Sequence, residues 1–468
     1  MADAVPRCFI KQNYYIMNTT DIQKLRIEEV FRSFKIGHGN IGDTVGPTVT
    51  MFDFTPSVGV RMSKIRGLKD ELAVALGVPS VRVIAPMENG KVGIEVPNSK
   101  RENVDLFDML ADNEYQEDME LPLAIGKTTD GKTFITDLAD MPHLLVAGAT
   151  GMGKSVGLNV ILMSLLNRKK PDELKLVLID PKQVELSVYN NIEKPYLAKL
   201  SYMEDAVITD VDDAKETLEA VIRLMEKRYS LLKDNNVRNI KEYNYLIDKG
   251  RIIGEKLPYY VVVIDEYGDL ILQSKGREME TAICRIAQKA RAVGIHMIIS
   301  TQRPDTKIVT GSIKANFPTR IAFRTTTGTD SRVVLDRIGA EKLTGNGDML
   351  YFAGGDFTRV QCAYVSTEDV MDMCFDIKEE YENCKQTYLP LPPQMEQASR
   401  VPEYVKKYAR QLAGRTFIHW QFYDDWIIKP LQELGIVGEL TETATGFSKT
   451  QGYEVLISDI DEIEKVLS

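Results

Sequence analysis

The chain reads Leu144-Leu-Val-Ala-Gly-Ala-Thr-Gly-Met-Gly-Lys-Ser155 at the stretch that decides its fold. The apolar run Leu144–Ala147 predicts a strand, and the periodic residues Val156–Leu166 predict a helix. The loop between them fits the pattern G-x-x-x-x-G-K-[ST], whose backbone N–H groups and helix N-terminus bind phosphate. We therefore predict a nucleoside triphosphate site made of eight consecutive residues: Gly148, Ala149, Thr150, Gly151, Met152, Gly153, Lys154 and Ser155.

Two side chains at the end of this loop have distinct tasks. Lys154 is expected to reach the β- and γ-phosphates of ATP, and the Ser155 hydroxyl is expected to ligate Mg²⁺. A chance match in a glycine-rich turn is the alternative. The strand before the loop and the helix after it favour the nucleotide site.

The composition is that of an ordinary soluble globular protein, with 44% hydrophobic and 27% charged residues in a chain of 468. No apolar stretch is long enough to span a membrane and the N-terminus lacks a signal-peptide core, so we expect a cytoplasmic protein without direct membrane insertion. The five cysteines are scattered without a C-x-x-C pair, which argues against a zinc site. The net charge of −10 argues against a surface that is basic all over, but it leaves room for a local basic strip that binds nucleic acid.

Strand candidates and helical patterns alternate from residue 121 to about residue 380. Helical patterns cover Asp212–Leu232 and Glu278–Ala292. Alternation of this kind predicts an α/β fold with a largely parallel sheet and helices on both faces. The strand candidates are Leu144–Ala147, Leu174–Ile179, Tyr259–Ile264, His296–Thr301, Arg320–Phe323 and Asp348–Phe352.

A chain of this length is expected to form two or three domains. We predict a lead-in over 1–20, an α+β module over 21–120, the nucleotide-binding core over 121–385, a linker containing prolines over 386–400 and a small α+β domain over 401–468.

The α+β module is predicted from helical periodicity and from one turn signal. Asn89-Gly90 predicts a β-hairpin between its last two strands. The predicted elements are helices over 20–36 and Ile65–Leu76, and strands over Thr48–Phe54, Arg82–Pro86 and Val92–Val96.

A second chemical signal is the run Tyr260-Val-Val-Val-Ile-Asp265-Glu266. β-Branched residues ending in two acids are typical of a buried parallel strand whose carboxyl end opens on a ligand site. Asp265 is expected to hold Mg²⁺ through its water shell, and Glu266 to orient or deprotonate the attacking water. A solvated acidic turn is the alternative, and the nearby phosphate loop favours the catalytic interpretation.

Gln302 follows another predicted strand, His296–Thr301. A polar amide at this position is expected to detect the γ-phosphate and to pass its loss to the next loop. The alternative is a polar end of the strand, with Pro304 as the residue that breaks it.

Arg291 ends a helical pattern just before Gly294. A guanidinium there is suited to neutralise charge during phosphoryl transfer in a neighbouring subunit, as an arginine finger. A basic residue that complements the helix C-terminus is an equally good interpretation from the residues alone.

Six motifs, in order along the chain, resemble those of the FtsK/SpoIIIE double-stranded DNA translocases. Two earlier segments, Val45–Thr50 and Val58–Ile65, resemble the α module of this family, so the resemblance covers roughly residues 20–370. The six motifs are Met141–Ser155, Leu178-Ile-Asp-Pro-Lys182, Val262-Val-Ile-Asp-Glu-Tyr267, Ala287–His296, Thr301-Gln-Arg-Pro304 and Gly347-Asp-Met-Leu-Tyr351.

The resemblance implies a RecA-like P-loop ATPase core of the ASCE type. It also implies a homo-oligomer, a hexameric ring that pumps double-stranded DNA through its channel by hydrolysing ATP with Mg²⁺. It favours Arg291 as the arginine finger, with Arg320 as the other candidate, and it suggests Asp180-Pro-Lys182 as a second acidic strand end lining the site.

The family's channel loops correspond to Lys307–Ala315 and Thr325–Arg332. The resemblance therefore offers Lys307, Lys314 and Arg332 as contacts to DNA phosphates, and solvated surface bases are the alternative. Where family members often carry a lysine in the second loop, this chain has Thr327-Gly328-Thr329, which predicts a weaker grip on DNA.

The chain departs from the family pattern at both ends. It shows no N-terminal membrane helices, as expected of a naturally soluble relative or of an excised motor. The tail 401–468 resembles a divergent winged helix with helices over 401–413 and 420–434 and strands near 439–441 and 453–457. Asp424 and Asp425 lie on the candidate reading helix and disfavour DNA, so protein docking is an equal alternative.

Two other functions stay open. A coupling ATPase for conjugative or secretion transport shares the phosphate loop and the acid pair, but lacks the α module seen at Val45–Ile65. An ATP-dependent DNA-binding scaffold would use ATP only to assemble.

Overall fold

The computed structural model describes residues 18–468 apart from several gaps. The gaps before the C-terminal part are 86, 88–89, 112–118 and 275–276; those within it are 393–402, 420–427, 429–430, 433–434, 446–447, 461 and 464–468. The chain divides into two compact units. The first ends at Tyr388 and leaves out Leu200–Tyr202, which group with the second unit, 389–468.

The first unit begins with the α+β module, in which helices cover a four-stranded antiparallel sheet of order β1-β2-β4-β3. The predicted helix over 65–76 is two helices separated at Leu68, and the predicted hairpin is confirmed by the pairing of β3 with β4, although Asn89 lies outside the described residues. The elements are α2 (Thr19–Ser33), β1 (Gly42–Val45), β2 (Val49–Phe54), α3 (Met62–Gly67), α4 (Lys69–Leu76), β3 (Arg82–Ile84) and β4 (Val92–Pro97). The predicted lead-in lies mostly outside the described residues.

The nucleotide-binding core is built on a ten-stranded sheet of order β10-β8-β11-β12-β7-β13-β14-β15-β5-β6. The six strands from β10 to β13 in this sheet order run parallel, as their largely apolar sequences predict for strands buried on both faces. They are β7 (His143–Ala147), β8 (Leu174–Ile179), β10 (Val207–Ile208), β11 (Tyr259–Ile264), β12 (Ile295–Thr301) and β13 (Thr319–Phe323).

The other end of the same sheet is antiparallel. The predicted strand Asp348–Phe352 is present as β14 and pairs antiparallel with β13, and the left-handed Gly354-Gly355 turn returns the chain directly into β15. The sheet is therefore mixed, not parallel throughout. The added strands are β5 (Pro122–Thr128), β6 (Thr133–Asp137), β14 (Asp348–Ala353) and β15 (Asp356–Cys362).

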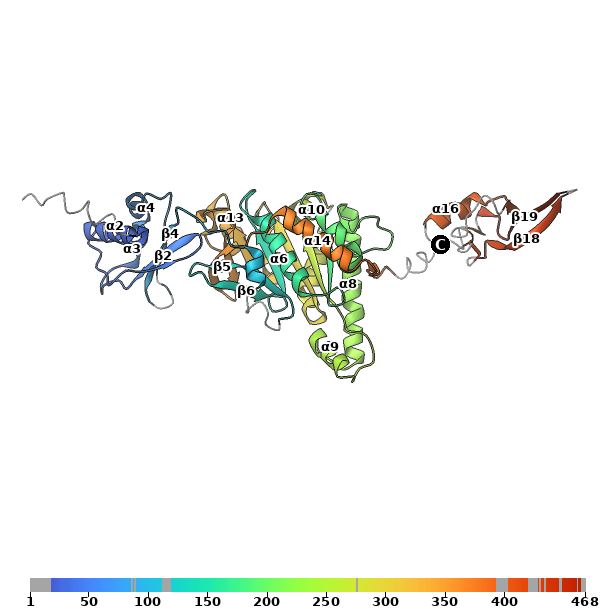
Figure 1. Ribbon diagram of the computed structural model, residues 1–468, viewed down its shortest axis with the longest axis horizontal. Coiled ribbons are helices and arrows are strands. Elements are labelled where there is room, and N and C mark those ends of the chain that lie inside the picture. Colours follow the sequence, from blue (N-terminus) through green and yellow to red (C-terminus); the bar gives the residue numbers. More distant parts are fainter. Residues whose placement is uncertain are drawn as a thin grey trace, which may run out of the picture. The chain divides into compact units, whose positions relative to one another are not determined.

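Helices cover both faces of the sheet, as predicted. Successive strand residues point to opposite faces; Leu144 and Val146 join the buried cluster formed with α6 and α14, while α10 and α11 contact β12. Figure 1 shows α6 and α14 in front of the strands. The helices of this core are α5 (Leu106–Leu110), α6 (Lys154–Arg168), α7 (Glu193–Tyr196), α8 (Val211–Asp234), α9 (Ile240–Asp248), α10 (Tyr267–Gln273), α11 (Glu278–Lys289), α12 (Gly311–Asn316), α13 (Gly328–Leu335) and α14 (Thr367–Glu380).

The structure shifts two of the predicted boundaries. Val104 and α5 pack in the cluster of the core, so the core begins well before residue 121. At the other end, β16 (Thr387–Tyr388) pairs with β9 (Ala198–Lys199), which places the start of the predicted linker in the core.

A buried charge cluster joins the α+β module to the core. Arg359 on β15 donates from Nη2 to Asp348 Oδ2 at 2.6 Å and pairs with Glu95 on β4. Arg82 also reaches Glu95, at 3.3 Å. Burial raises the pKa of Asp348, but the charge of Arg359 and the hydrogen bonds from Arg359 and Thr344 together outweigh that effect and hold the pKa below its usual range.

Replacing Arg359 with methionine should destabilise the first unit by about 3–5 kcal/mol, because two buried carboxylates would lose their shared cation. Urea denaturation followed by circular dichroism measures this loss. The matched control is Lys132→Met, which removes a cation paired with Asp130 but 81% exposed and should cost less than about 1 kcal/mol. A loss equally small for Arg359→Met would contradict the role of the cluster.

The second unit has a small core around a three-stranded antiparallel sheet of order β17-β19-β18. Its elements are α16 (Glu403–Gln411), β17 (Phe417–His419), β18 (Val437–Thr445) and β19 (Ser448–Val455). The first predicted helix and both predicted strands are present, and β17 is an addition. Most of the predicted helix 420–434, with Asp424 and Asp425, lies outside the described residues, so the winged-helix interpretation stays a prediction.

Among the described residues, none of the helices combines the length and the apolar character that a bilayer crossing requires.

Candidate active site

The glycine-rich loop connects β7 to α6 as predicted, and its glycines are required by its geometry. Gly151 has φ 75° and Gly153 has φ 113°. A Cβ on Gly153 would lie 2.7 Å from the backbone nitrogen of Gly347, so only glycine fits there. The N–H groups of Gly148 and Ala149 donate to the carbonyls of Thr301 and Arg324, so these two residues anchor the loop to its neighbouring strands.

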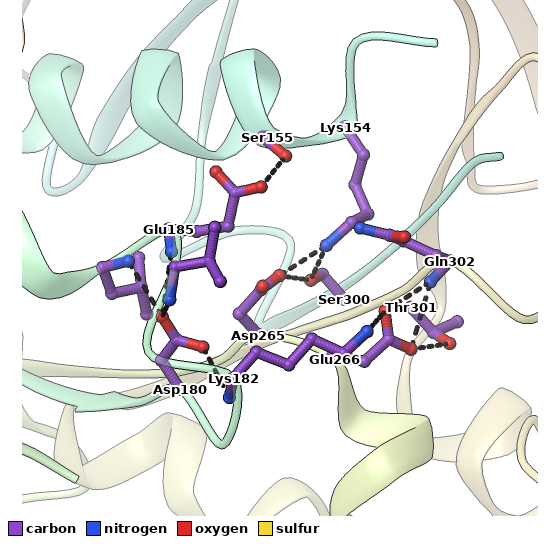
Figure 2. A network of polar contacts seen from close by, with 12 residues as sticks. Lys154, Ser155, Asp180, Lys182, Glu185, Asp265, Glu266, Ser300, Thr301 and Gln302 are labelled. Atoms are coloured by element: carbon purple, nitrogen blue, oxygen red, sulfur yellow. Dashed lines mark hydrogen bonds and ion pairs between the residues drawn. The ribbon is translucent and has the colours of Figure 1, made fainter. Parts of the chain in front are cut away.

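Lys154 is buried and lies against the first acid of the predicted pair. Its Nζ is 2.5 Å from Asp265 Oδ1 and donates to Ser300 Oγ at 3.0 Å, and Ser300 in turn donates to Asp265 (Figure 2). The register explains the meeting: β12 lies between β7 and β11, so the carboxyl ends of all three strands open at one edge. Ser300 was not predicted from sequence.

Glu266 is fully buried in an unusual backbone conformation. Its φ is 48°, a left-handed value that is strained for a residue with a side chain. Its carboxylate accepts from Thr301 Oγ1 at 3.0 Å and from the backbone N–H of Gln302 at 3.1 Å. Thr301 and Gln302 thus hold Glu266 in this strained conformation.

Gln302 connects this acid to the phosphate loop. Its backbone contacts Glu266, and its side-chain Oε1 accepts from Thr150 Oγ1 at 2.9 Å. The structure thus brings the predicted sensor between the loop and the predicted water-orienting acid.

The loop after β8 supplies a third set of polar groups. Asp180 accepts five backbone N–H bonds, from Lys182 through Leu186, so its carboxylate is used to shape that loop rather than to line the site. The residue that reaches the site is Glu185, whose Oε1 accepts from Ser155 Oγ at 2.5 Å. Sequence analysis missed Glu185 because its place depends on the turn that Asp180 creates.

Lys182 on the same loop faces the second acid. Its Nζ lies 3.5 Å from Glu266 Oε2 and 3.1 Å from Asp269 Oδ2. Burial lowers the pKa of Lys182, but the hydrogen bond to Asp269 and the charge of Glu266 outweigh it and raise that pKa. Lys182 therefore stays protonated beside Glu266.

A cavity of about 510 Å³ opens over the phosphate loop. Its wall includes four polar residues that are distant from the phosphate loop in sequence and that no local pattern predicts: Asn103, Asn346, Gln361 and Tyr364. The volume is in the usual range for small-molecule sites.

The residues around Ser155 suit Mg²⁺. Ser155 and Asp265 offer a hydroxyl and a carboxylate oxygen, which is the chemistry that this hard cation prefers, and Glu185 accepts from the Ser155 hydroxyl. Among the described residues, no three His, Cys, Asp or Glu side chains lie together in a way that could hold a metal ion.

Arg291 lies at the opposite edge of the sheet from the phosphate loop, in the 3-10 helix Ala290–Val293 that precedes β12. Its guanidinium is 58% exposed and 3.8 Å from Asp140. Seven strand residues separate the two edges, a span of about 20 Å. It cannot contact the nucleotide of its own chain.

Arg320 was the other candidate finger, and the structure contradicts that role. Its guanidinium is buried, donates to the carbonyls of Lys314, Phe317 and Val334, and pairs with Asp336 at 2.6 Å. Arg320 is a structural residue of the fold.

The three predicted DNA-contacting side chains differ in their exposure to solvent and in their ion pairing. Lys307, on the loop after Gln302, and Arg332, on α13, are exposed. Lys314 is only 24% exposed and pairs with Asp336 at 2.6 Å, so it is held in the fold.

Comparison with known proteins identifies the family. The model described as FtsK/SpoIIIE family matches residues 105–306, and the one described as FtsK alpha domain matches residues 11–98. The DNA translocase FtsK of Haemophilus influenzae is 44% identical over an alignment of 377 residues that covers 75% of this chain and 69% of that protein. The chain belongs to the FtsK/SpoIIIE family.

Other relatives of the family are longer than the region matched. The DNA translocase FtsK of Chlorobaculum tepidum is 44% identical over 79% of this chain, and the matched region is 46% of that protein. For the DNA translocase FtsK of Treponema pallidum, the matched region is 43% of the protein. The chain thus spans about half the length of these curated FtsK/SpoIIIE relatives.

Solved structures agree on the fold. The pCW3 conjugation coupling protein TcpA, in a monomer form with ATPgS, superposes with a TM-score of 0.53 at 25% identity, over 77% of this chain and 99% of that one. The cytoplasmic domain of the Thermomonospora curvata type VII secretion ATPase EccC also superposes with a TM-score of 0.53. Its sequence identity is 20%, and the match covers 75% of this chain and 42% of that one. With the family assignment, this confirms the predicted RecA-like P-loop ATPase fold.

Proposed function

We propose that this FtsK/SpoIIIE protein hydrolyses ATP with Mg²⁺ and uses the energy to translocate double-stranded DNA as a hexameric ring. The observation that carries the proposal is the position of Gln302. It bonds to the phosphate loop through Thr150 and to Glu266 through its backbone, and the loop with Lys307 begins directly after it. A change at the γ-phosphate is thereby connected to a candidate DNA-contacting loop.

In this mechanism Lys154 leaves Asp265 to bind the β- and γ-phosphates. Asp265 is then free to face Mg²⁺ and its waters; the cation, when bound, neutralises phosphate charge. Glu266 takes a proton from a water whose oxygen bonds to the γ-phosphorus as the bond to the β-phosphate oxygen breaks, which yields ADP and phosphate.

The exposed position of Arg291 supports a site shared between subunits. A guanidinium that cannot reach its own nucleotide is placed to neutralise the transition state in a neighbour. This requires an oligomer, and the family resemblance suggests the hexamer.

The rival functions differ in their response to DNA. A coupling or secretion ATPase has the same fold, as TcpA and EccC show, but the FtsK alpha domain match at 11–98 favours the translocase. The test is steady-state ATP hydrolysis with and without linear duplex DNA: strong stimulation supports the proposal, and hydrolysis indifferent to DNA contradicts it.

Replacing Lys307 with alanine should weaken the response to DNA without affecting hydrolysis in its absence, because this exposed cation lies outside the nucleotide site. We expect a several-fold higher DNA concentration for half-maximal stimulation and a salt slope smaller by about 1, as for one lost phosphate contact. Lys233→Ala, at the exposed end of α8, is the matched control. An equal fall of basal and stimulated rates would exclude Lys307 as a DNA contact.

A further inference from the structure

A third carboxylate stands beside the acid pair, on a different element. Glu185 belongs to the loop after β8, and its Oε1 accepts a hydrogen bond from Ser155 Oγ at 2.5 Å (Figure 2). Asp265 and Glu266 end β11 instead. The predicted metal ligand Ser155 therefore has a carboxylate partner of its own.

The position of Glu185 is fixed by backbone hydrogen bonds of its loop to Asp180. Asp180 is fully buried and binds the N–H groups on both sides of Glu185, at 3.0 Å to Val184 and 3.1 Å to Leu186, as well as that of Glu185 itself at 3.0 Å. Leu186 is buried in the core cluster. The loop is thus held at both sides of the residue that touches Ser155.

This contact orients the serine. A hydroxyl oxygen that ligates a cation offers a lone pair, so its proton must be donated elsewhere. Glu185 accepts this hydrogen bond, which directs the lone pairs of Ser155 Oγ away from Glu185. Partners that orient a ligand in this way usually contribute 10–100-fold to metal affinity.

We propose that Glu185 is a positioning residue for Mg²⁺ at the nucleotide site, acting through Ser155. The inference rests on the nucleotide site of the proposed function, but not on DNA translocation. A purely structural Glu185 would affect folding or nucleotide binding regardless of the metal. A positioning role affects only the dependence on Mg²⁺.

The test measures binding without turnover. A fluorescent ATPγS analogue is titrated onto the full chain in EDTA and at rising Mg²⁺, for wild type, Glu185→Ala and Glu185→Gln. We expect Glu185→Ala to raise, by about 10–100-fold, the Mg²⁺ concentration at which half of the Mg²⁺-dependent increase in nucleotide binding is reached. Nucleotide binding in EDTA should be unchanged. Glu185→Gln should lie between, because its amide oxygen still accepts the proton without the charge.

A double-variant cycle separates action through Ser155 from a direct effect. Ser155→Ala should shift the Mg²⁺ dependence, and adding Glu185→Ala should shift it no further, because the two residues act as a unit. Glu382→Ala, which removes an exposed carboxylate in the turn after α14, is the matched control.

Three outcomes overturn the inference: an unchanged Mg²⁺ dependence in Glu185→Ala, additive shifts in the double variant, or wild-type binding that is indifferent to Mg²⁺. A failure of DNA to stimulate hydrolysis would overturn the proposed function while a shifted Mg²⁺ dependence still supports Glu185, so the two failures are distinguishable.

Discussion

ATP hydrolysis should fall by about 10²–10⁴-fold when Glu266 is replaced by glutamine, the range typical for loss of a general base. An amide oxygen in place of Glu266 Oε1 can still accept from Thr301 Oγ1 and, at 3.3 Å, from the backbone N–H of Gln302, so the strained backbone keeps these two contacts. What is lost is the ability to take a proton from water. Steady-state phosphate release with saturating duplex DNA measures the effect.

Nucleotide binding separates chemistry from folding in this variant. Glu266→Gln should bind a fluorescent ATP analogue as wild type does, because Lys154 and the phosphate loop are untouched. Glu379→Gln, an exposed position on α14, should leave both hydrolysis and binding unchanged. If Glu266→Gln hydrolysed ATP within a few-fold of wild type, the assignment of the base would be wrong.

Loss of the guanidinium in Arg291→Ala should reduce hydrolysis by about 10³-fold or more, the low end of the range for arginine fingers. The side chain is exposed and about 20 Å from its own phosphate loop across β12, so the loss must act on a neighbour. Lys289→Ala, which removes a second exposed cation two residues away, is the control and should change the rate little.

Mixing two inactive variants tests whether the site is shared. Arg291→Ala subunits retain Glu266, and Glu266→Gln subunits retain Arg291, so mixed oligomers contain some complete interfaces. We expect hydrolysis to recover partly on mixing. Oligomers that mix without any recovery would show that Arg291 does not complete a neighbour's site.

The predictable parts of the molecule were those with a strong local pattern. The phosphate loop follows from glycine spacing, β8 and β11 follow from mostly apolar runs, and both acids of 265–266 were placed at the correct strand end. Ser300 and Thr301 lie at the end of a strand that was predicted. Their hydrogen bonds to Asp265 and Glu266 could not be predicted, because they depend on β12 lying beside β11.

The residues that sequence analysis missed or misjudged depend on tertiary contacts. Arg320 looks like a free guanidinium in the sequence, and only the fold shows that Asp336 and three carbonyls hold it. Asp180 resembles a second acidic strand end that lines the site, yet its carboxylate accepts from the backbone of its own loop, and Glu185 is the residue that contacts Ser155. β5 and β6 carry polar residues and were not recognised as strands of the core sheet.

The central claim is that ATP hydrolysis moves the protein along duplex DNA, and displacement of a roadblock tests it most directly. A linear duplex carries a third strand or a tightly bound protein near one end, and its release is followed after ATP is added. The account predicts rapid release by wild type with ATP, and none with ATPγS or with Glu266→Gln. Hydrolysis stimulated by DNA but with the roadblock left in place would contradict translocation and identify an ATP-dependent scaffold instead.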